Sequence, residues 1–321
     1  MREAGQPRKR EVGWRVAVLA MAAVVTLMYG CKKPELQEEI GAKAFSSPES
    51  AGKAVYEAAK AGDTNSVLAI FGPEGREYLL TEDPNQDKSA LEKFAGDYEK
   101  MHRWATLESG AVVLDVGVEN YPFPFPLVRT ADGQWAFSAE QAKKEMQARE
   151  IGDNELTVIE VLNQMADAQT EYFSTTHEGS KVKQYAQRFT SSDGKHDGLY
   201  WKVGEGEVES PLGPLAARAS AEGYAKGTKE SPQSFHGYFY RILKGQGTHA
   251  EGGAKNYVVN GNMTRGYAIL AYPAEYRTSG VMTFIIEKDG RVYQKDAGAE
   301  TVETAKAITL FDPDETWSLV E

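Results

Sequence analysis

Residues 111–138, AVVLDVGVENYPFPFPLVRTADGQWAFS, hold the pattern that decides the fold of the first half of the chain. Residues 111–118 are rich in valine, which is typical of a strand, and residues 123–130 give a second strand. Asp132-Gly133 is a hairpin signal, and it leads into a third strand at residues 134–138. The stretch therefore predicts an antiparallel sheet.

Three prolines stand at alternate positions within this stretch, in residues 121–126, YPFPFP. Proline cannot donate a hydrogen bond to a sheet ladder, so the run suits an edge strand. Alternatively, its aromatic side chains line a pocket between the sheet and the helices. We favour the edge strand.

Three helices are predicted before this sheet. Ser47-Pro48 marks the start of the first, because proline is well tolerated at the first helical position. Asp63 caps a second helix, which Gly72-Pro73 stops, and apolar residues at helical spacing predict a third at about residues 86–101. Helices followed by an antiparallel sheet define the α+β class.

The second half of the chain repeats this class of fold. A short helix at residues 140–149 leads to a predicted boundary at Gly152-Asp153, and an amphipathic helix at residues 156–173 follows. Residues 175–209 are polar, and a connection of this length either packs through its aromatic residues or moves. The further predicted elements are a helix at 211–224, strands at 235–244, 256–260, 266–272, 281–287 and 292–295, and a helix at 301–308.

The first thirty residues have the three parts of a secretory signal. Basic residues come first, the uncharged apolar run of residues 16–29 follows, and Gly30 precedes Cys31, the one cysteine of the chain. The run is shorter than the roughly 20 residues that a membrane-spanning helix needs. This arrangement resembles the lipobox of bacterial lipoproteins, in which a diacylglycerol is attached to the cysteine and the chain is cut before it.

The lipobox resemblance is imperfect, because Met28 and Tyr29 stand where leucine and a small residue are usual. The alternative is an uncleaved signal anchor with an incidental cysteine. If Cys31 is lipidated, its acyl chains are the membrane partner. Lys32 is not the aspartate that marks inner-membrane retention, so the expected location is the periplasmic side of the outer membrane.

The predicted organisation has four parts. Residues 1–30 are the signal peptide and residues 31–44 are a tether. Residues 45–151 form one α+β domain and residues 152–321 form a second. Each domain is predicted to pack helices on an antiparallel sheet.

Composition excludes several kinds of chemistry. Lipidation of Cys31 leaves no thiol for a disulfide, a metal site or a nucleophile. The chain has a formal net charge of −11. Without residues 1–30, which hold five Lys/Arg and two Asp/Glu, it has 31 basic and 45 acidic residues and a net charge of −14. This charge disfavours nucleic acid as a partner, and it also keeps the protein soluble.

Few residues suggest a catalytic or metal site. The best candidate is His236, which alternates with Tyr238 and Tyr240 along a predicted strand and forms a polar pocket if Asp197 and Tyr200 lie nearby. The alternative is a half-buried sheet face. The remaining histidines, at 102, 177, 196 and 249, lack the spacing of a zinc helix.

Other motifs favour structural explanations. Asp83, Asn85 and Asp87 copy the start of a calcium loop, but the sixth position is Lys88 instead of glycine, so a helix cap or turn is favoured. There is no G-x-S-x-G elbow and no phosphate-binding glycine loop. The glycines of residues 245–253 join two strands and indicate a hairpin loop. The aspartate pairs 193/197 and 312/314 could serve as acid and base only at the right separation. We expect no cofactor and no metal.

Long motifs resemble the bacterial family called domain of unknown function 2950. They are FHGYFYRIL (235–243), NYVVNGNMTRGYAILAYPAEYRTSGVMTFIIEKDGRVYQKDAG (256–298), NELTVIEVLNQMADAQTEY (154–172) and DGLYW (197–201). The resemblance covers residues 45 to about 317. It implies an exported envelope protein, and it brings no established activity or catalytic residues.

Two weaker resemblances concern the halves. AAKAGDTNSVLAIF (58–71) and DGQWAFS (132–138) resemble the cone-shaped domains of the nuclear-transport-factor-2-like group, whose pocket serves catalysis in some members and binding in many. The second half resembles type IV pilin and pseudopilin head domains, through AQTEYF (168–173) and SGVMTFIIEKDGRVYQKD (279–296). The apolar helix that assembles pilin filaments is missing, so only the head fold is implied.

Two hypotheses about function follow. The favoured one is a non-enzymatic envelope lipoprotein that binds other envelope proteins or a small ligand. The alternative is a periplasmic hydrolase that acts on cell-wall or glycan material, with its site in the cone-shaped pocket or beside His236. A deep pocket in which polar groups converge would support the enzyme, and shallow aromatic surfaces would support binding.

Overall fold

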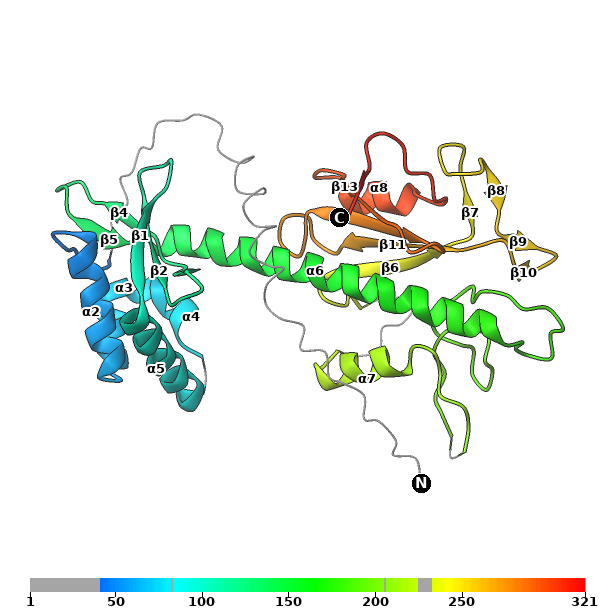
Figure 1. Cartoon of the computed structure of the whole chain (residues 1–321), viewed down its shortest axis with the longest axis horizontal. Coiled ribbons are helices and arrows are strands. Elements are labelled where there is room, and N and C mark those ends of the chain that lie inside the picture. Colours follow the sequence, from blue (N-terminus) through cyan, green and yellow to red (C-terminus); the bar gives the residue numbers. More distant parts are fainter. Residues whose placement is uncertain (1–40, 82, 205, 225–232, 321) are drawn as a thin grey trace, which may run out of the picture. The chain divides into compact units, whose positions relative to one another are not determined.

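A computed structural model describes residues 41–81, 83–204, 206–224 and 233–320 of the chain. The chain divides into two compact units, residues 1–146 and 147–321. Helices and antiparallel sheets occur in both, so the α+β class is confirmed (Figure 1). The predicted signal peptide, Cys31 and the first part of the predicted tether lie outside the described residues.

The first unit begins with helices whose starts follow local capping rules. They are α2 (Pro48–Lys60), α3 (Thr64–Phe71), the 3-10 turn η2 (Pro73–Gly75), α4 (Arg76–Leu79) and α5 (Pro84–Lys100). Ser47 and Ser50 form a reciprocal capping box at α2. Asp63 and Asp83 accept backbone N–H groups at the starts of α3 and α5. The three predicted helices and the cap at Asp83 are confirmed, whereas η2 and α4 were not predicted.

The sheet of the first unit is antiparallel, with the order β1-β2-β4-β5. Its strands are β1 (His102–Thr106), β2 (Val112–Val116), β3 (Tyr121–Pro122), β4 (Leu127–Arg129) and β5 (Trp135–Phe137). β1 was not predicted. β3 is exposed and bonds to β2, so the edge strand favoured for the proline run is confirmed at Tyr121–Pro122 only. The strand predicted at residues 123–130 is limited to β4.

Phenylalanine rings fill the space between the helices and the sheet of this unit. The Phe71 ring lies 4.7 Å from Phe125 and 4.6 Å from Phe137, and Phe123 lies 5.2 Å from Phe94, between ring centroids. The chain already contacts this unit before Phe45, because the backbone N–H of Lys43 donates to the Ile70 carbonyl at the end of α3. The aromatic side chains of the proline run therefore pack in a core.

One helix of 36 residues, α6 (Ala139–Ser174), passes through the division between the units. The predicted end of a short helix before Gly152-Asp153 is wrong, because α6 is continuous there. A glycine inside a helix costs only about 1 kcal/mol relative to alanine. The next turns bury Val158 and Leu162 completely, and such packing outweighs a local propensity.

The second unit is built on an antiparallel sheet with the order β14-β13-β12-β11-β6. Its strands are β6 (Tyr238–Leu243), β11 (Ala268–Pro273), β12 (Met282–Glu287), β13 (Val292–Asp296) and β14 (Ser318–Leu319). Two small ladders pair β7 (Gly245–Gln246) with β8 (Lys255–Asn256), and β9 (Val258–Val259) with β10 (Asn262–Met263). The helices besides α6 are α7 (Gly213–Ala221) and α8 (Thr301–Ala307).

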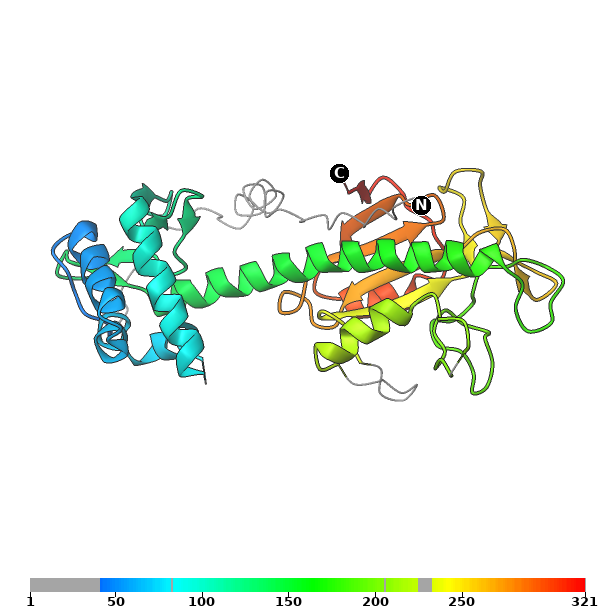
Figure 2. The same cartoon turned by 60° about the horizontal axis from the view of Figure 1, so that its bottom comes forward.

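The two faces of this sheet carry different helices. Figure 2 shows α6 along one face and α8 on the opposite face. On the α6 face, the Tyr238 hydroxyl lies 3.4 Å from Glu155 of α6. On the α8 face, the Arg241 guanidinium donates to the carbonyls of Ala305, Lys306 and Ile308. A cation at these free carbonyls fixes the C-terminal end of α8.

The connection at residues 175–209 packs through its aromatic residues, the first of the two predicted alternatives. The Tyr185 ring stacks on Phe173 with centroids 4.4 Å apart, and Trp201 is buried. The predicted hairpin loop at residues 245–253 is held by Gln246, whose buried side chain donates to the carbonyls of Glu251 and Gly253.

Candidate functional site

His236 does not lie on a strand. The strand predicted from residue 235 begins at Tyr238, and residues 235–238 form a tight hairpin turn closed by two backbone hydrogen bonds between Phe235 and Tyr238. The central residues His236 and Gly237 have φ angles of +48° and +71°. Positive φ at both central positions is typical of a type I′ turn. The predicted alternation of His236 with Tyr238 and Tyr240 is therefore wrong.

The neighbours of His236 come from the end of α7 and the residues after it. Its Nε2 atom lies 3.1 Å from a carboxylate oxygen of Glu222, but the contact does not meet hydrogen-bond geometry, so the two groups are close without a hydrogen bond. Its backbone N–H donates to the Tyr224 hydroxyl at 3.2 Å.

The other two predicted site residues have structural partners. Asp197 accepts hydrogen bonds from the backbone N–H and hydroxyl of Ser192. Burial acts to raise the pKa of Asp197, but these hydrogen bonds and Arg188 outweigh it and hold the pKa below its usual range. Tyr238 is fully buried, its hydroxyl donates to the Met282 carbonyl at 2.9 Å, and burial raises its pKa. His236 and Asp197 thus have separate sets of contacts.

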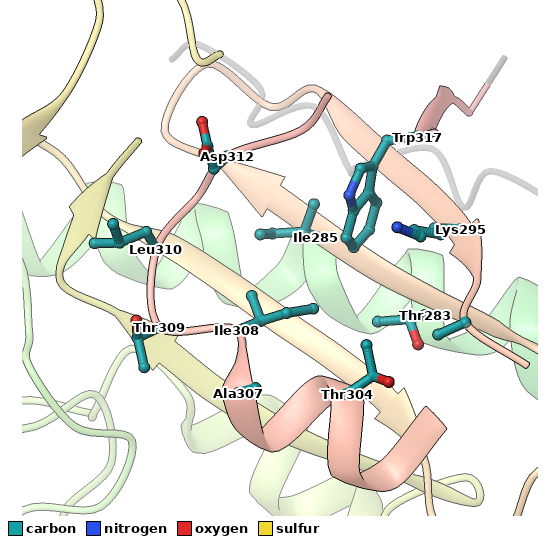
Figure 3. Close-up of a pocket in the computed structure, with 11 residues that line it drawn as sticks. Thr283, Ile285, Lys295, Thr304, Ala307, Ile308, Thr309, Leu310, Asp312 and Trp317 are labelled. Atoms are coloured by element: carbon teal, nitrogen blue, oxygen red, sulfur yellow. The ribbon is translucent and has the colours of Figure 1, made fainter. Parts of the chain in front are cut away.

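A cavity of about 270 Å³ lies on the α8 face of the C-terminal sheet, and we call it the α8 pocket. Its floor comes from β12 and β13, and its walls come from α8 and the segment after α8 (Figure 3). The lining residues include Thr283, Ile285, Lys295, Ile308, Asp312 and Trp317. The volume is just below the range of roughly 300–1,000 Å³ for ligand sites, so it suits a small molecule.

Thr283 is the buried polar residue of the α8 pocket. Its side chain is 1% exposed, and its Oγ1 atom has no hydrogen-bond partner within the described part of the chain. A buried hydroxyl without a partner costs about 1–3 kcal/mol. Such a group is rare in a folded protein, and it requires an explanation.

Lys295 brings a positive charge to the same place. The antiparallel register of β12 and β13 pairs Thr283 directly with Lys295, so both side chains lie on one face. The Lys295 ammonium lies 5.9 Å from the centre of the Trp317 ring. Within the described residues, no carboxylate lies within ion-pair distance of it. In Figure 3 these three residues stand at one end of the pocket, with Leu310 and Asp312 at the other.

Asp312 belongs to a second pair at the rim. One of its oxygens lies 3.0 Å from His249 Nδ1, and the other accepts the His249 backbone N–H at 2.7 Å. The hydrogen bond to Asp312 raises the pKa of His249. Burial acts to raise the pKa of Asp312, but the contacts with His249 outweigh it and the pKa lies below the usual range.

Sequence reasoning missed the α8 pocket. It noted Asp312 and His249 separately, but 63 residues separate them and no spacing connects them. Thr283, Lys295 and Trp317 come from two strands and the C-terminal segment, and they form no motif. The available signal was the hairpin at Asp289-Gly290, which places residues of β12 opposite residues of β13.

Two further findings concern membranes and metals. Among residues 41–320, apart from the gaps noted above, no helix is both long and apolar enough to cross a membrane. The same part of the chain holds no group of three or more His, Cys, Asp or Glu residues that could bind a metal ion. Cys31, the predicted lipid attachment site, lies outside the described residues.

Comparison with curated proteins and with solved structures found no match. The resemblances to nuclear-transport-factor-2-like domains and to pilin heads therefore stay predictions. The model of a family described as "Protein of unknown function (DUF2950)" matches residues 42–320. The predicted family is thereby confirmed. Since the match spans nearly the whole chain beyond the predicted signal, this protein belongs to the DUF2950 family.

Proposed function

We propose that this protein is an exported envelope lipoprotein, without enzymatic activity, that binds a small molecule in the α8 pocket. The observation that supports binding is the buried and unpartnered hydroxyl of Thr283, a residue that lines the pocket. A buried polar group without a partner is destabilising, so its presence in a cavity is explained if a ligand completes the hydrogen bond.

The proposed location rests on the sequence. The basic start, the apolar run and the cysteine at position 31 together support export and lipid attachment. The acyl chains would hold the protein on a membrane, and we expect the periplasmic side of the outer membrane. In this proposal the first unit serves as a scaffold that contacts other envelope proteins.

The binding proposal is tested on the full chain in detergent with a library of uncharged and charged small molecules, using ligand-observed NMR. We expect some members to bind the native chain and to lose binding when Trp317→Ala removes one wall of the pocket. Gly96→Ala is the control, because a β-carbon at this helical glycine of the first unit meets no atom within 4 Å. Binding that persists unchanged in Trp317→Ala would count against the α8 pocket.

The lipid anchor has its own test. Replacing Cys31 with alanine should release the protein from the membrane fraction or leave the signal uncut, and cell fractionation with a mobility assay measures both. Unchanged size and unchanged membrane retention in Cys31→Ala would contradict lipidation.

One observation favours the hydrolase as a second candidate. The contact of Asp312 with Nδ1 of His249 is the contact that orients a catalytic histidine in hydrolases, and Asp312 lines the α8 pocket. A hydrolase would lose turnover of cell-wall fragments or glycans in His249→Gln. We expect no turnover by the native chain.

A further inference from the structure

We infer that the ligand of the α8 pocket is a small organic carboxylate, whose charged group lies at Lys295 and Thr283 and whose apolar body lies along Trp317 and Ile285. This inference rests on the proposed function, since it names the chemical class that the same pocket takes. It depends on which groups at the polar end donate hydrogen bonds, on where the negative charge of the pocket lies, and on the size of the cavity.

The polar end offers donors and a positive charge. The ammonium of Lys295 has three N–H donors and cannot accept a hydrogen bond. The hydroxyl of Thr283 can donate as well, and within the described residues it has no acceptor. An ionised carboxylate accepts hydrogen bonds only, so it is complementary to both groups.

The charge of Lys295 is available to a ligand. Its neighbour across the sheet is Thr283, which is neutral, and its ammonium faces the Trp317 ring at 5.9 Å. Asp314 lies close enough for Lys295 to help lower the Asp314 pKa, but the two do not form an ion pair within 4 Å. A carboxylate placed beside Lys295 would gain a charge-assisted hydrogen bond, which is about twice as strong as a neutral one.

The acidic residue of the pocket does not oppose this arrangement. Asp312 stands at the other end of the cavity in Figure 3. Both of its oxygens are engaged by His249, one by the imidazole and one by the backbone N–H. A ligand anion at Lys295 is thus separated from Asp312 by the apolar middle of the pocket, where Ile285 and Ile308 lie.

The rest of the cavity fits an apolar body of modest size. Ile285 is 1% exposed and forms part of the floor, and the Trp317 indole forms a wall. Burial of apolar ligand surface against these groups is favourable by roughly 25 cal/mol per Å². With a volume of about 270 Å³, the cavity has room for a short aliphatic or single-ring acid.

Other ligand classes match less well. A neutral sugar can accept hydrogen bonds from Lys295 through its hydroxyl oxygens, but it brings no negative charge to the ammonium. A phosphate group can also bind to a lysine, but it carries up to two negative charges, and the described residues that line this pocket offer one cation, Lys295. A cation would be repelled by Lys295.

The test uses matched pairs of ligands on the full chain in detergent. Each pair is an organic carboxylate and its uncharged primary amide: acetate, butyrate, hexanoate and phenylacetate with acetamide, butyramide, hexanamide and phenylacetamide. Ligand-observed NMR titrations give the affinities. We expect at least one acid to bind. Its amide should bind at least about tenfold more weakly, because the amide lacks the negative charge that pairs with the Lys295 ammonium.

Two variants locate the charged group. Lys295→Met keeps the length of the side chain and should remove the preference for acid over amide. Thr283→Val keeps the shape and should weaken acid binding about fivefold, the effect of one neutral hydrogen bond. Lys306→Met is the matched control, because Lys306 lies on α8, pairs with Glu303 at 2.7 Å and does not line the pocket.

The outcomes separate this inference from the proposed function. Amides that bind as well as acids, or an acid affinity unchanged in Lys295→Met, would overturn the carboxylate while leaving the α8 pocket as a binding site. The carboxylate would also be overturned, and the pocket kept, if no acid binds but uncharged library members bind and lose binding in Trp317→Ala. Failure of both the acids and the library to bind would overturn the pocket itself.

Discussion

The two faces of the C-terminal sheet bury polar groups in opposite ways. On the α6 face, one oxygen of Glu155 accepts the backbone N–H groups of Val281 and Met282, each at 2.8 Å, and lies 3.4 Å from the Tyr238 hydroxyl. On the α8 face, the hydroxyl of Thr283 has no partner within the described residues. Met282 and Thr283 are successive residues of β12, so the two cases are one residue apart.

This difference separates polar groups that stabilise the fold from polar groups that are available for function. Burial raises the pKa of Glu155, and the backbone hydrogen bonds lower it in part, as expected of a carboxyl group held inside a structure. Its contacts join α6 to the start of β12. Within the described residues, the Thr283 hydroxyl has no hydrogen-bond partner and Lys295 has no ion-pair partner, and both residues line a cavity. A site is therefore better sought on the α8 face.

The largest effect should come from removing the acceptor on the α6 face. Glu155→Ala leaves the N–H groups of Val281 and Met282 without their acceptor. Each half-buried unpaired donor costs roughly 1–3 kcal/mol, so we expect a loss of about 2–4 kcal/mol in the free energy of unfolding of the second unit. Urea unfolding followed by tryptophan fluorescence measures this loss.

Glu155→Gln is the matched control for this loss. The glutamine keeps the side-chain oxygen that accepts both N–H groups, so most of the stability should remain. Equal losses for alanine and glutamine would show that the charge of Glu155, and not its acceptor oxygen, stabilises the α6 face.

A smaller loss is expected from crowding the same network. A β-carbon on Gly280 would lie 2.1 Å from the hydroxyl oxygen of Tyr238 and 2.5 Å from its ring. Tyr238 is fully buried, so Gly280→Ala must displace it, at a cost of about 1–3 kcal/mol in the free energy of unfolding. Gly96→Ala should be neutral or stabilising, because its β-carbon meets no atom and alanine is the better helix former. A fully stable Gly280→Ala would contradict the tight contact.

Local signals in the sequence were sufficient to predict where helices start. Ser47-Pro48, Asp63 and Asp83 each start a helix as predicted, because a helix cap is a contact between residues two or three positions apart. The predicted end of a helix before Gly152 failed because it also relied on a local signal. A glycine is a local signal, and the packing that carries α6 through it comes from residues distant in the sequence.

The α8 pocket could not be predicted, because a single residue of register decides it. A two-residue turn at Asp289-Gly290 would place Thr283 opposite Asp296. In the structure the turn holds residues 288–290, Gly290 has a φ of +78°, and Thr283 pairs with Lys295 instead. A shift of one residue exchanges the faces of a strand, and it would have put a carboxylate across from Thr283 in place of an ammonium.

On the α8 face, a substitution should stabilise the protein. Thr283→Val replaces an unpartnered buried hydroxyl by a methyl group of similar size, so we expect a gain of about 1 kcal/mol in the free energy of unfolding. Ser210→Ala removes another buried and unpartnered hydroxyl, away from the pocket lining, and should give a similar gain. Only Thr283→Val should also weaken ligand binding. A loss of stability in Thr283→Val would show that its hydroxyl does have a partner.

The smallest effect concerns Asp312, the polar group of the α8 pocket that does have partners. Its hydrogen bond raises the pKa of His249 above the ordinary value of 6.5. This contact therefore contributes fully to stability below about pH 6.5 and loses its contribution as the pH rises through the raised pKa. The His249 side chain is 58% exposed, so solvent screens the contact and the change in stability is small.

Asp312→Asn should lower the pKa of His249 toward its ordinary value, as followed by NMR titration of the imidazole. Asp314→Asn should lower it less, because Asp314 acts on His249 only through space. Equal shifts in the two variants would mean that Asp312 does not hold His249 by a hydrogen bond, and that the acidic end of the pocket is as open to a ligand as the basic end.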